Sequence, residues 1–468
     1  MFDNKAESIL HTDIRRTASF PATLPMLKTN RIKNLLGNLA WIGAVALLLT
    51  GVGAIRVRSQ SIVGETIIGQ PIQARTGEAI VQIRKGADPF IVRRILGNSA
   101  ALVTQFNGAP MVLRSDPALL TQKLDALARA GILQFAEPNY IARASFVPND
   151  QLYRAYQWNL FPRGTRSGRG ISGYGIQAET AWNYASGQGI IVAVIDTGVA
   201  YETRGKFLKA PDLNKTMFVP GWNFINNTPY ANDDQGHGTH VTGTIAQSTN
   251  NSTGCGGVAW GASIMPLKAL DSSGAGTYSN IAAAIIWAAN RGANIINLSL
   301  GGPVDSPTLK SAILYAKNKN VLIVCASGND GAKAICYPAR YPECIAVGAT
   351  RFDGRRAPYS NYGAELDLMA PGGDNTVDQN ADGVPDGIVQ MTFAGNPQQM
   401  NYYLFSGTSM AAPHVAGAAA LVWSRNRAWS ATTVRQALET SAFKIGSPDQ
   451  YGKGLVDAYT ALLWRPGK

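Results

Sequence analysis

The chain has 468 residues, 46% of them hydrophobic, and a formal net charge of +12. This length allows two or three domains with an ample core. Most of the excess positive charge lies before residue 145, and the Lys and Arg residues that follow are scattered without interleaved aromatics, so we exclude nucleic acid as a partner.

Residues 1–55 are typical of a targeting segment. An apolar run from Leu39 to Ile55 follows Arg31 and Lys33 and is closed by Arg56. The run has about 17 residues, which is the lower limit for a spanning helix and slightly long for a signal peptide. We favour a cleaved signal peptide over a retained membrane anchor. A buried core helix is a third alternative, but positive charge at both ends argues against it.

Residues 56–144 contain a compact unit of alternating strand and helix signals. Asp88-Pro89 and Asp116-Pro117 open helices that run to Leu96 and Ala130. Strands are predicted at 79–83, 101–106, 110–113 and 132–136. The order β-α-β-β-α-β is the split-βαβ pattern of a small α+β, ferredoxin-like domain. A polar link over 145–150 follows it.

From Gly187 onward, continuous apolar runs alternate with helical segments. Such runs are typical of strands buried on both faces of a sheet, and they lie at 190–195, 263–270, 293–300, 321–326, 344–349 and 366–370. Helices are predicted at 240–246, 278–290, 308–319, 430–441 and 455–463. The alternation predicts an α/β fold with a doubly wound, mostly parallel sheet and helices on both faces. Ligands of such sheets bind beyond the carboxyl ends of the strands.

A further helix is predicted where Gly407-Thr-Ser-Met-Ala-Ala-Pro-His runs into an apolar segment that ends at Val422. Because it is apolar on all sides, it should be buried. We place Pro413 in its first turn, where the missing N–H costs nothing. Ser409 then lies at the mouth of the helix, where free N–H groups favour negative charge. An ordinary N-cap serine is the alternative.

Three other motifs supply polar partners at strand or helix ends. Asp196-Thr-Gly follows the strand at 190–195, and Ser327-Gly-Asn329 follows the strand at 321–326. His237 and His240 lie three residues apart where a helix starts. A metal pair is one reading of the two histidines, but no third ligand stands at the usual spacing.

Together these motifs resemble those of a subtilisin-like serine peptidase. The resemblance rests on Asp196-Thr-Gly, His237-Gly-Thr-His, Ser327-Gly-Asn329 and the Ser409 motif, in the chain order Asp, His, Ser. It covers roughly residues 149–459. The segment before it resembles the inhibitory propeptide of such enzymes. The resemblance implies an exported serine endopeptidase made as a self-processing zymogen.

The implied roles agree with the chemistry of the residue types. A serine hydroxyl needs a base to take its proton, and His237 matches that base. Asp196 would hold the imidazole in the correct tautomer. The Asn329 amide and the Ser409 backbone N–H would form the oxyanion hole. We interpret His240, and His414 in the helix interior, as core residues.

Two glycine-rich stretches match the family's substrate cleft. Edges of this kind leave backbone groups free to pair with an extended peptide, although plain turn chemistry is the alternative. The implied substrate-binding residues are Gly274, Ala275, Gly276, Tyr278, Ser299, Leu300, Gly301 and Gly302. Cys336 departs from the family, since many relatives have glycine there, at the foot of the pocket for the side chain preceding the cut bond.

Calcium is implied at two places. A loop with oxygen-bearing side chains and a glycine at its sixth position resembles the start of an EF-hand, but Val389 replaces the closing Glu. Its ligands would be Asp378, Asn380, Asp382 and Asp386. An acidic surface loop is the alternative. By resemblance, a second structural site would use Asp150, Asp212 and Asn251.

The cysteines support neither a disulfide-built scaffold nor a thiolate metal site. Four cysteines are too few for such a scaffold, and none lies in a Cys-x-x-Cys spacing. All fall in the later domain, at Cys255, Cys325, Cys336 and Cys344. In an exported protein they allow up to two bridges, with three pairings open.

We therefore divide the chain into residues 1–55, a signal peptide or membrane anchor; 56–144, an inhibitory propeptide; and 145–468, the peptidase domain. We expect a monomer that binds polypeptides as an extended strand and is inhibited by its own propeptide. One alternative is a catalytically inactive subtilase-fold binding module. Another is a membrane-tethered processing peptidase, which differs in whether 39–55 is removed.

Overall fold

The structure is a computed structural model and describes residues 66–67, 70–71, 74–97, 101–102, 111–141, 146–167 and 171–467. Its described residues fall into two compact units. One comprises Gly77–Glu137, and the other comprises Ser61–Thr76 with Pro138–Lys468. The predicted targeting segment, including Leu39 to Ile55, lies outside the described residues. None of the described helices is long and apolar enough to cross a membrane.

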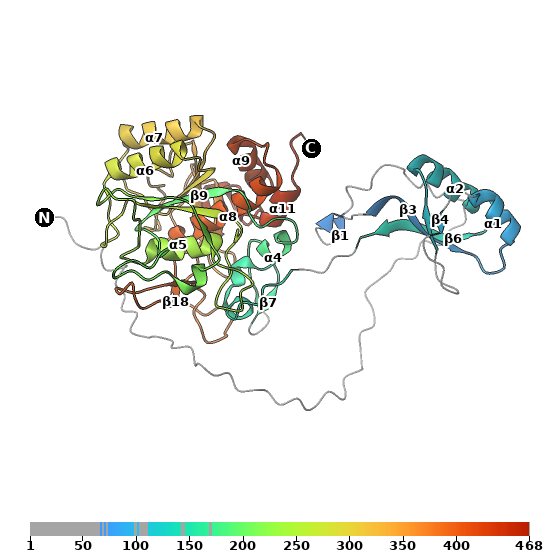
Figure 1. Cartoon of the computed structure of the whole chain (residues 1–468), viewed down its shortest axis with the longest axis horizontal. Coiled ribbons are helices and arrows are strands. Elements are labelled where there is room, and N and C mark those ends of the chain that lie inside the picture. Colours follow the sequence, from blue (N-terminus) through green and yellow to red (C-terminus); the bar gives the residue numbers. More distant parts are fainter. Residues whose placement is uncertain are drawn as a thin grey trace, which may run out of the picture. The chain divides into compact units, whose positions relative to one another are not determined.

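The first unit is a four-stranded sheet with two helices on one face (Figure 1). Its elements are β3 (Ala74–Ile83), α1 (Pro89–Leu96), β4 (Ala101–Leu102), β5 (Met111–Arg114), α2 (Pro117–Arg129) and β6 (Leu133–Tyr140). The strand order is β4-β5-β3-β6, and the pairs β3–β5 and β4–β5 are antiparallel. These elements come in the predicted order, although residues 103–110 lie outside the described part. A short hairpin of β1 (Thr66–Ile67) and β2 (Gln70–Pro71) precedes them.

Sequence chemistry explains where these helices begin. The Asp88 carboxylate accepts a hydrogen bond from Phe90 N, and the Asp116 carboxylate accepts one from Ala118 N. A proline then occupies the first helical position, where its missing N–H costs nothing. Strand β6 runs further than predicted, through Pro138. This proline is tolerated because β6 is an edge strand.

The second unit is built around a parallel sheet, as predicted. The strand order is β10-β12-β9-β13-β14-β15-β16, and β11 also pairs with β12. The bounds are β9 (Ile191–Asp196), β10 (Met217–Phe218), β11 (Trp222–Asn223), β12 (Ser263–Lys268), β13 (Ile295–Leu298), β14 (Leu322–Ala326), β15 (Cys344–Thr350) and β16 (Leu368–Pro371). Each named pair in this sheet is parallel.

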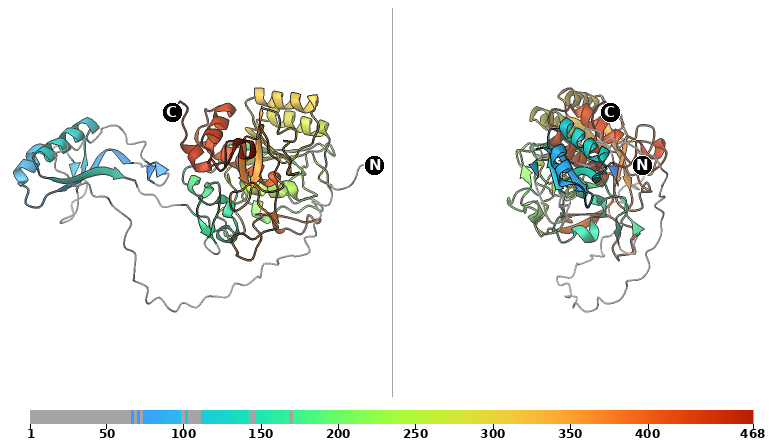
Figure 2. Two further views of the ribbon diagram at one scale, coloured as in Figure 1. Left: turned by 180° about the vertical axis from the view of Figure 1, so that it is seen from behind. Right: turned by 90° about the vertical axis from the view of Figure 1, so that its right-hand side faces the viewer.

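Helices cover both faces of this sheet, and the alternation along β9 shows how. Val192 and Val194 join a core that includes helix α5 (His237–Ala246) and helix α8 (Thr408–Arg425). Ala193 and Ile195 join the opposite core, beneath α6 (Tyr278–Asn290) and α7 (Pro307–Asn318). Figure 1 and Figure 2 show α6 and α7 side by side on the outer face. Because both faces are buried, the strands are apolar throughout.

Shorter elements complete the second unit. An antiparallel hairpin that the sequence did not predict is formed by β17 (Ile388–Thr392) and β18 (Asn401–Phe405). The C-terminal helices are α9 (Ala431–Thr440), α10 (Pro448–Tyr451) and α11 (Ala458–Leu463). The remaining elements are α3 (Tyr153–Tyr156), η1 (Trp158–Leu160), β7 (Arg166–Ser167), β8 (Ile171–Ser172), α4 (Ala178–Ala181) and η2 (Pro211–Leu213).

Candidate active site

Asp196 and His237 are in direct contact. Asp196 is the last residue of β9 and His237 is the first of α5. The His237 Nδ1 lies 2.7 Å from the Asp196 Oδ1, which also accepts a hydrogen bond from Thr197 N. Asp196 is fully buried, whereas the His237 side chain is 21% exposed. In neutral His237, a proton on Nδ1 that is donated to Asp196 leaves Nε2 free to accept one.

Opposing influences set the pKa of His237. Burial lowers it, but the charge of Asp196, its hydrogen bond and the charge of Asp233 raise it. The net pKa lies above the ordinary value of 6.5. The imidazolium is therefore favoured relative to a free histidine, which suits a base that must carry a proton briefly.

Asp233 fixes the turn that leads into His237. Its Oδ1 accepts hydrogen bonds from Thr197 Oγ1, Gln235 N and Gly236 N. Its Oδ2 accepts from the backbone N and side-chain Oγ1 of Thr239. Helix α5 thus receives a carboxylate at its N-terminus, where a negative charge is stabilising. The same carboxylate links the turn after Asp196 to the helix that carries His237.

Glycine at 238 permits the close approach of these two segments. A Cβ built on Gly238 would lie 2.1 Å from the carbonyl oxygen of Gly198 and 3.0 Å from the Asp196 Cβ. No larger residue fits without separating α5 from the end of β9. The His-Gly-Thr order is therefore a packing requirement of the Asp196–His237 contact.

Ser409 is the second residue of α8, and the N-cap is Gly407, which offers no side-chain hydrogen bond. The N-cap alternative for Ser409 is therefore wrong. The Ser409 Oγ donates to the carbonyl oxygen of Ser299 at 3.1 Å. Within the described residues, no hydrogen bond joins Ser409 Oγ to His237. The structure thus shows the Asp–His contact and leaves the hydroxyl turned toward Ser299.

Pro413 lies in the second turn of α8, as its sixth residue, so the first-turn prediction was wrong. A residue here would normally donate its N–H to the carbonyl of Ser409, four positions earlier. Proline has no N–H, and the Ser299 Oγ donates to Ser409 O instead, at 2.8 Å. The hydroxyl of Ser299 thereby replaces the hydrogen bond that proline removes.

Asn329 presents its amide beside the start of α8. Its Oδ1 accepts hydrogen bonds from Thr408 N at 2.9 Å and Thr408 Oγ1 at 2.8 Å, which leaves Nδ2 as the outward donor. A Cβ built on Gly407 would lie 3.6 Å from both Asn329 Nδ2 and Ser409 N. Glycine at 407 therefore leaves open the space where these two N–H donors converge.

The two predicted cleft edges are neighbours in space. A Cβ on Gly302 would lie 2.4 Å from the Tyr278 hydroxyl, and that hydroxyl donates to Val304 O. One edge is the loop Gly274, Ala275 and Gly276 that leads to Tyr278. The other comprises Ser299, Leu300, Gly301 and Gly302. Glycine at 302 makes room for the tyrosine between them.

Cys336 lies against the second edge. A Cβ built on Gly301 would come within 2.3 Å of the Cys336 Sγ, and one on Gly328 would lie 3.5 Å from it. Burial raises the pKa of this thiol to about 12, so it is neutral near pH 7. Its bulk, rather than thiolate chemistry, is what it contributes beside Gly301.

His240 and His414 are buried core residues, as predicted. The His240 Nε2 lies 3.0 Å from Ile388 O, and burial lowers its pKa to about 3. The His414 Nδ1 lies 2.8 Å from Met410 O, and burial lowers its pKa to about 4. Both are therefore neutral at physiological pH.

Comparison with known proteins agrees with this geometry. Residues 187–454 match the Subtilase family, Peptidase S8. The chain belongs to the subtilase family. It is similar to Subtilisin Savinase of Lederbergia lenta, with 44% identity over 287 residues, 61% of this chain and 96% of the relative. It is also similar to the Thermophilic serine proteinase of Bacillus sp. (strain AK1), with 40% identity over 341 residues, 72% of this chain and 75% of that one.

Solved structures show the same family. Proteases from Pseudoalteromonas arctica superpose with a TM-score of 0.60 and 31% identity, covering 68% of this chain and 99% of theirs. This subtilase is thus a subtilisin-like serine peptidase with the mostly parallel sheet typical of the family.

The residues predicted to bind calcium form two clusters in this subtilase. In one, the Asn251 side-chain amide donates to Asp212 Oδ1 at 2.8 Å, and Asn251 N lies 3.2 Å from Asp150 Oδ1. In the other, the Asn380 amide donates to Asp386 at 3.0 Å, and Asp382 N donates to Asn380. Counting only His, Cys, Asp and Glu, the described residues contain no group of three suited to a metal.

All four cysteines are free thiols. The two that lie closest in the sheet are Cys325 on β14 and Cys344 on β15. The strand register pairs Cys325 with Ala346, so the two cysteines are offset by two residues. Burial and a hydrogen bond with the Cys344 thiol raise the pKa of the Cys325 thiol.

Sequence reasoning missed Asp233 and Lys268. Lys268 ends β12 and is only 2% exposed. The sequence did contain a signal for Lys268. A lysine within an apolar strand that is buried on both faces must have partners, because an unpaired buried charge is costly. Asp233, four residues before His237, was part of a motif but had no role of its own.

Proposed function

We propose that this subtilase is an exported serine endopeptidase that works through an acyl-enzyme and is made as a self-processing zymogen. The observation that supports it most is the 2.7 Å contact of Asp196 with His237, with Nε2 left for a proton from Ser409. The nucleophile would be Ser409, the base His237, and the orienting carboxylate Asp196.

The reaction begins when Ser409 Oγ turns from Ser299 O and gives its proton to His237 Nε2. The oxygen attacks the substrate carbonyl, a C–O bond forms, and the carbonyl electron pair moves onto its oxygen. Asn329 Nδ2 and Ser409 N stabilise that oxyanion, in the space that Gly407 leaves open. His237 then protonates the leaving amine as the C–N bond breaks. Water attacks the acyl-enzyme by the same route.

The substrate would bind as an extended strand between the two cleft edges. Backbone groups of Gly274–Gly276 and of Ser299–Gly301 are suited to pair with a peptide on either side. The side chain that precedes the cut bond would meet Cys336, whose sulfur stands beside Gly301 and Gly328. We therefore expect a smaller side chain to be preferred there.

Calcium would stabilise the fold at the two clusters. Both offer carboxylate and amide oxygens, the donors that Ca²⁺ prefers. Burial raises the pKa of Asp212 and the pKa of Asp386 to about 6. The negative charges of Asp382 and Asp378 also raise the pKa of Asp386. Carboxylates held together against their own repulsion are suited to a cation. Asp378, Asn380, Asp382 and Asp386 would hold one ion, and Asp150, Asp212 and Asn251 another.

The experiment that tests this proposal is N-terminal sequencing of the secreted protein, beside the Ser409→Ala variant. We expect the wild type to begin near residues 143–149 and the variant to keep residues 56–144. Secretion of the variant from a start near residue 56 would also support a cleaved signal peptide. An unprocessed wild type, or a variant processed like the wild type in a protease-free host, would contradict self-processing.

A further inference from the structure

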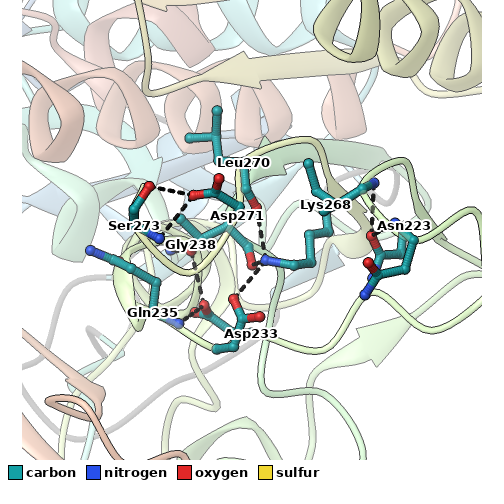
Figure 3. Close-up of polar contacts among 12 residues, drawn as sticks. Asn223, Asp233, Gln235, Gly238, Lys268, Leu270, Asp271 and Ser273 are labelled. Carbon is teal, nitrogen blue, oxygen red and sulfur yellow. Dashed lines mark hydrogen bonds and ion pairs between the residues drawn. The ribbon is translucent and has the colours of Figure 1, made fainter. Parts of the chain in front are cut away.

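Lys268 is a buried cation next to the candidate catalytic pair. It is the last residue of β12, in register with Asp196 at the end of β9. The backbone also links the two strand ends, since Ala269 N and Leu270 N both donate to Asp196 O, at 3.0 and 3.1 Å. Figure 3 shows the Lys268 side chain reaching toward the loop that carries Asp233.

The Lys268 ammonium uses all three of its hydrogens on three different segments. It donates to Thr197 O, in the turn after Asp196, at 2.7 Å. It donates to Asp234 Oδ1, three residues before His237, at 2.7 Å. It donates to Leu270 O, where the first cleft edge begins, also at 2.7 Å. One side chain therefore joins the Asp196 turn, the His237 loop and the cleft edge.

The cleft edge beyond Leu270 has a defined shape that this contact anchors. The Asp271 carboxylate accepts hydrogen bonds from Ser273 N and Ser273 Oγ (Figure 3) and from Ala275 N. A Cβ on Gly276 would lie 2.3 Å from Ala269 O, so the far end of the loop returns to the residue after Lys268. A movement of Leu270 would therefore displace the whole loop, including the backbone of Gly274–Gly276.

Because Lys268 is buried, the loss of any of these three hydrogen bonds would be costly. An ammonium removed from water must keep its hydrogen bonds, since the alternative is an uncompensated charge. Asp234 remains 25% exposed, so its charge tolerates the loss of the lysine better than Lys268 tolerates the loss of its acceptors. The geometry of all three segments is thus tied to a single group that does not itself reach the reacting atoms.

We propose that Lys268 is a positioning residue that couples the substrate-edge loop to the Asp196–His237 pair. The inference rests on the proposed function, in which the loop aligns the substrate and His237 is the base. It states that Lys268 holds both in position. Removing the ammonium would loosen the loop and the Asp196 turn together, so it would change both KM and kcat.

The test compares Lys268→Met with Asp234→Ala and the wild type after active-site titration, which counts only folded, reactive sites. Two substrates separate the effects: a small activated ester, which reports Ser409 and His237, and an extended peptide that also fills the cleft edge. Lys310→Met is the matched control. Lys310 lies on α7 and also forms an ion pair, with Glu343, but it contacts none of the three segments that Lys268 joins.

We expect Lys268→Met to lower ester turnover by about tenfold to a hundredfold and to raise the peptide KM as well, since small misplacements at a site are costly. Asp234→Ala keeps both carbonyl contacts, so its losses should be smaller, roughly twofold to fivefold. Lys310→Met should keep wild-type constants.

The proposal would be overturned if Lys268→Met and Asp234→Ala both kept the wild-type kcat and KM per titrated site. Their melting temperatures would not change this conclusion. If Lys268→Met yields no folded enzyme, unchanged constants in Asp234→Ala would still overturn it. A wild type that does not titrate would instead contradict the proposed function, so the two failures are distinguishable.

Discussion

We expect the protonation of His237, the proposed base, to set the acidic limit of activity. Burial lowers its pKa, whereas Asp196 and Asp233 raise it above 6.5, and the buried neighbour His240 stays neutral. A base works only when it is neutral, so kcat/KM should fall as pH drops through the folded pKa. For stability the sign is opposite. The raised pKa stabilises the fold fully below 6.5, and this stabilisation is lost as pH rises through the folded value.

Asp233→Asn should move the acidic limb of the kcat/KM profile to lower pH. The substitution removes one of the negative charges that favour the imidazolium, so the base stays neutral further into acid. The measurement is kcat/KM against pH for the variant, the wild type and the exposed control Asp449→Asn. A limb that stays in place, or moves to higher pH, would show that Asp233 does not act on His237 through charge.

At this scale the sequence singled out four residues that stand in short motifs. These four are Asp196, His237, Asn329 and Ser409, and each lies in a short motif whose neighbouring residues identify it. Sequence reasoning missed Lys268, which stands in no motif, and the role of Asp233, which lies in one. Lys268 stands in an apolar strand and shows its partners, Thr197 O, Asp234 and Leu270 O, only once the strands are in register. Contacts between segments far apart in the chain are not visible in a local pattern.

Near the start of helix α8, a side-chain hydrogen bond replaces a backbone hydrogen bond of the helix. Pro413 cannot donate to Ser409 O, and Ser299 Oγ does so from a different segment. Local pattern reasoning placed Pro413 in the first turn, because interior proline is normally excluded. A tertiary partner made the interior position acceptable, which no local rule could have predicted.

Ser299→Ala should therefore destabilise the protein by about 1–3 kcal/mol, because it leaves the Ser409 carbonyl unsatisfied. Adding Pro413→Ala supplies a backbone N–H to that carbonyl and should recover part of the loss. Unfolding of the four members of this cycle is best measured in a Ser409→Ala background, which prevents self-digestion. Strictly additive effects would show that the two groups do not share this acceptor.

The loop from Asp378 to Asp386 should bind calcium. Asp382→Ala should reduce the rise in melting temperature that calcium causes, whereas Asp449→Ala should not. Binding to the native state alone adds about 2.7 kcal/mol at a hundredfold excess over Kd. Melting with calcium and with chelator makes the comparison. An undiminished calcium effect in Asp382→Ala would place the ion elsewhere, with the Asp150, Asp212 and Asn251 cluster as the next candidate.

Across the whole molecule, the order of elements was easier to predict than the hairpin of β17 and β18. The parallel strands are continuous apolar runs, and their alternation with helices fixes the layer arrangement. The hairpin has a half-exposed second strand, Asn401–Phe405, with two tyrosines and an asparagine. It follows a loop rich in Asp and Gly, so neither apolar continuity nor strict alternation identified it.

Residues 56–144 should inhibit the mature enzyme and assist its folding. We expect their tail to pair with the glycine-lined edges and to remain there as a product after cleavage. A doubly wound sheet with many non-local pairings folds slowly, which gives a template a purpose. The test is to add the isolated segment to mature enzyme and to refold the peptidase domain with and without it. Absence of inhibition at micromolar concentration, with normal refolding from residue 145, would contradict both roles.

The most direct test of the central claim is to label the protein with a fluorophosphonate and locate the adduct by mass spectrometry. We expect one adduct, on Ser409, that is lost in Ser409→Ala and strongly reduced in His237→Ala. Peptidase turnover of Ser409→Ala should fall by a factor on the order of 10⁶, because no other group can form the acyl-enzyme. An adduct on another serine, or near-normal turnover without Ser409, would contradict the account.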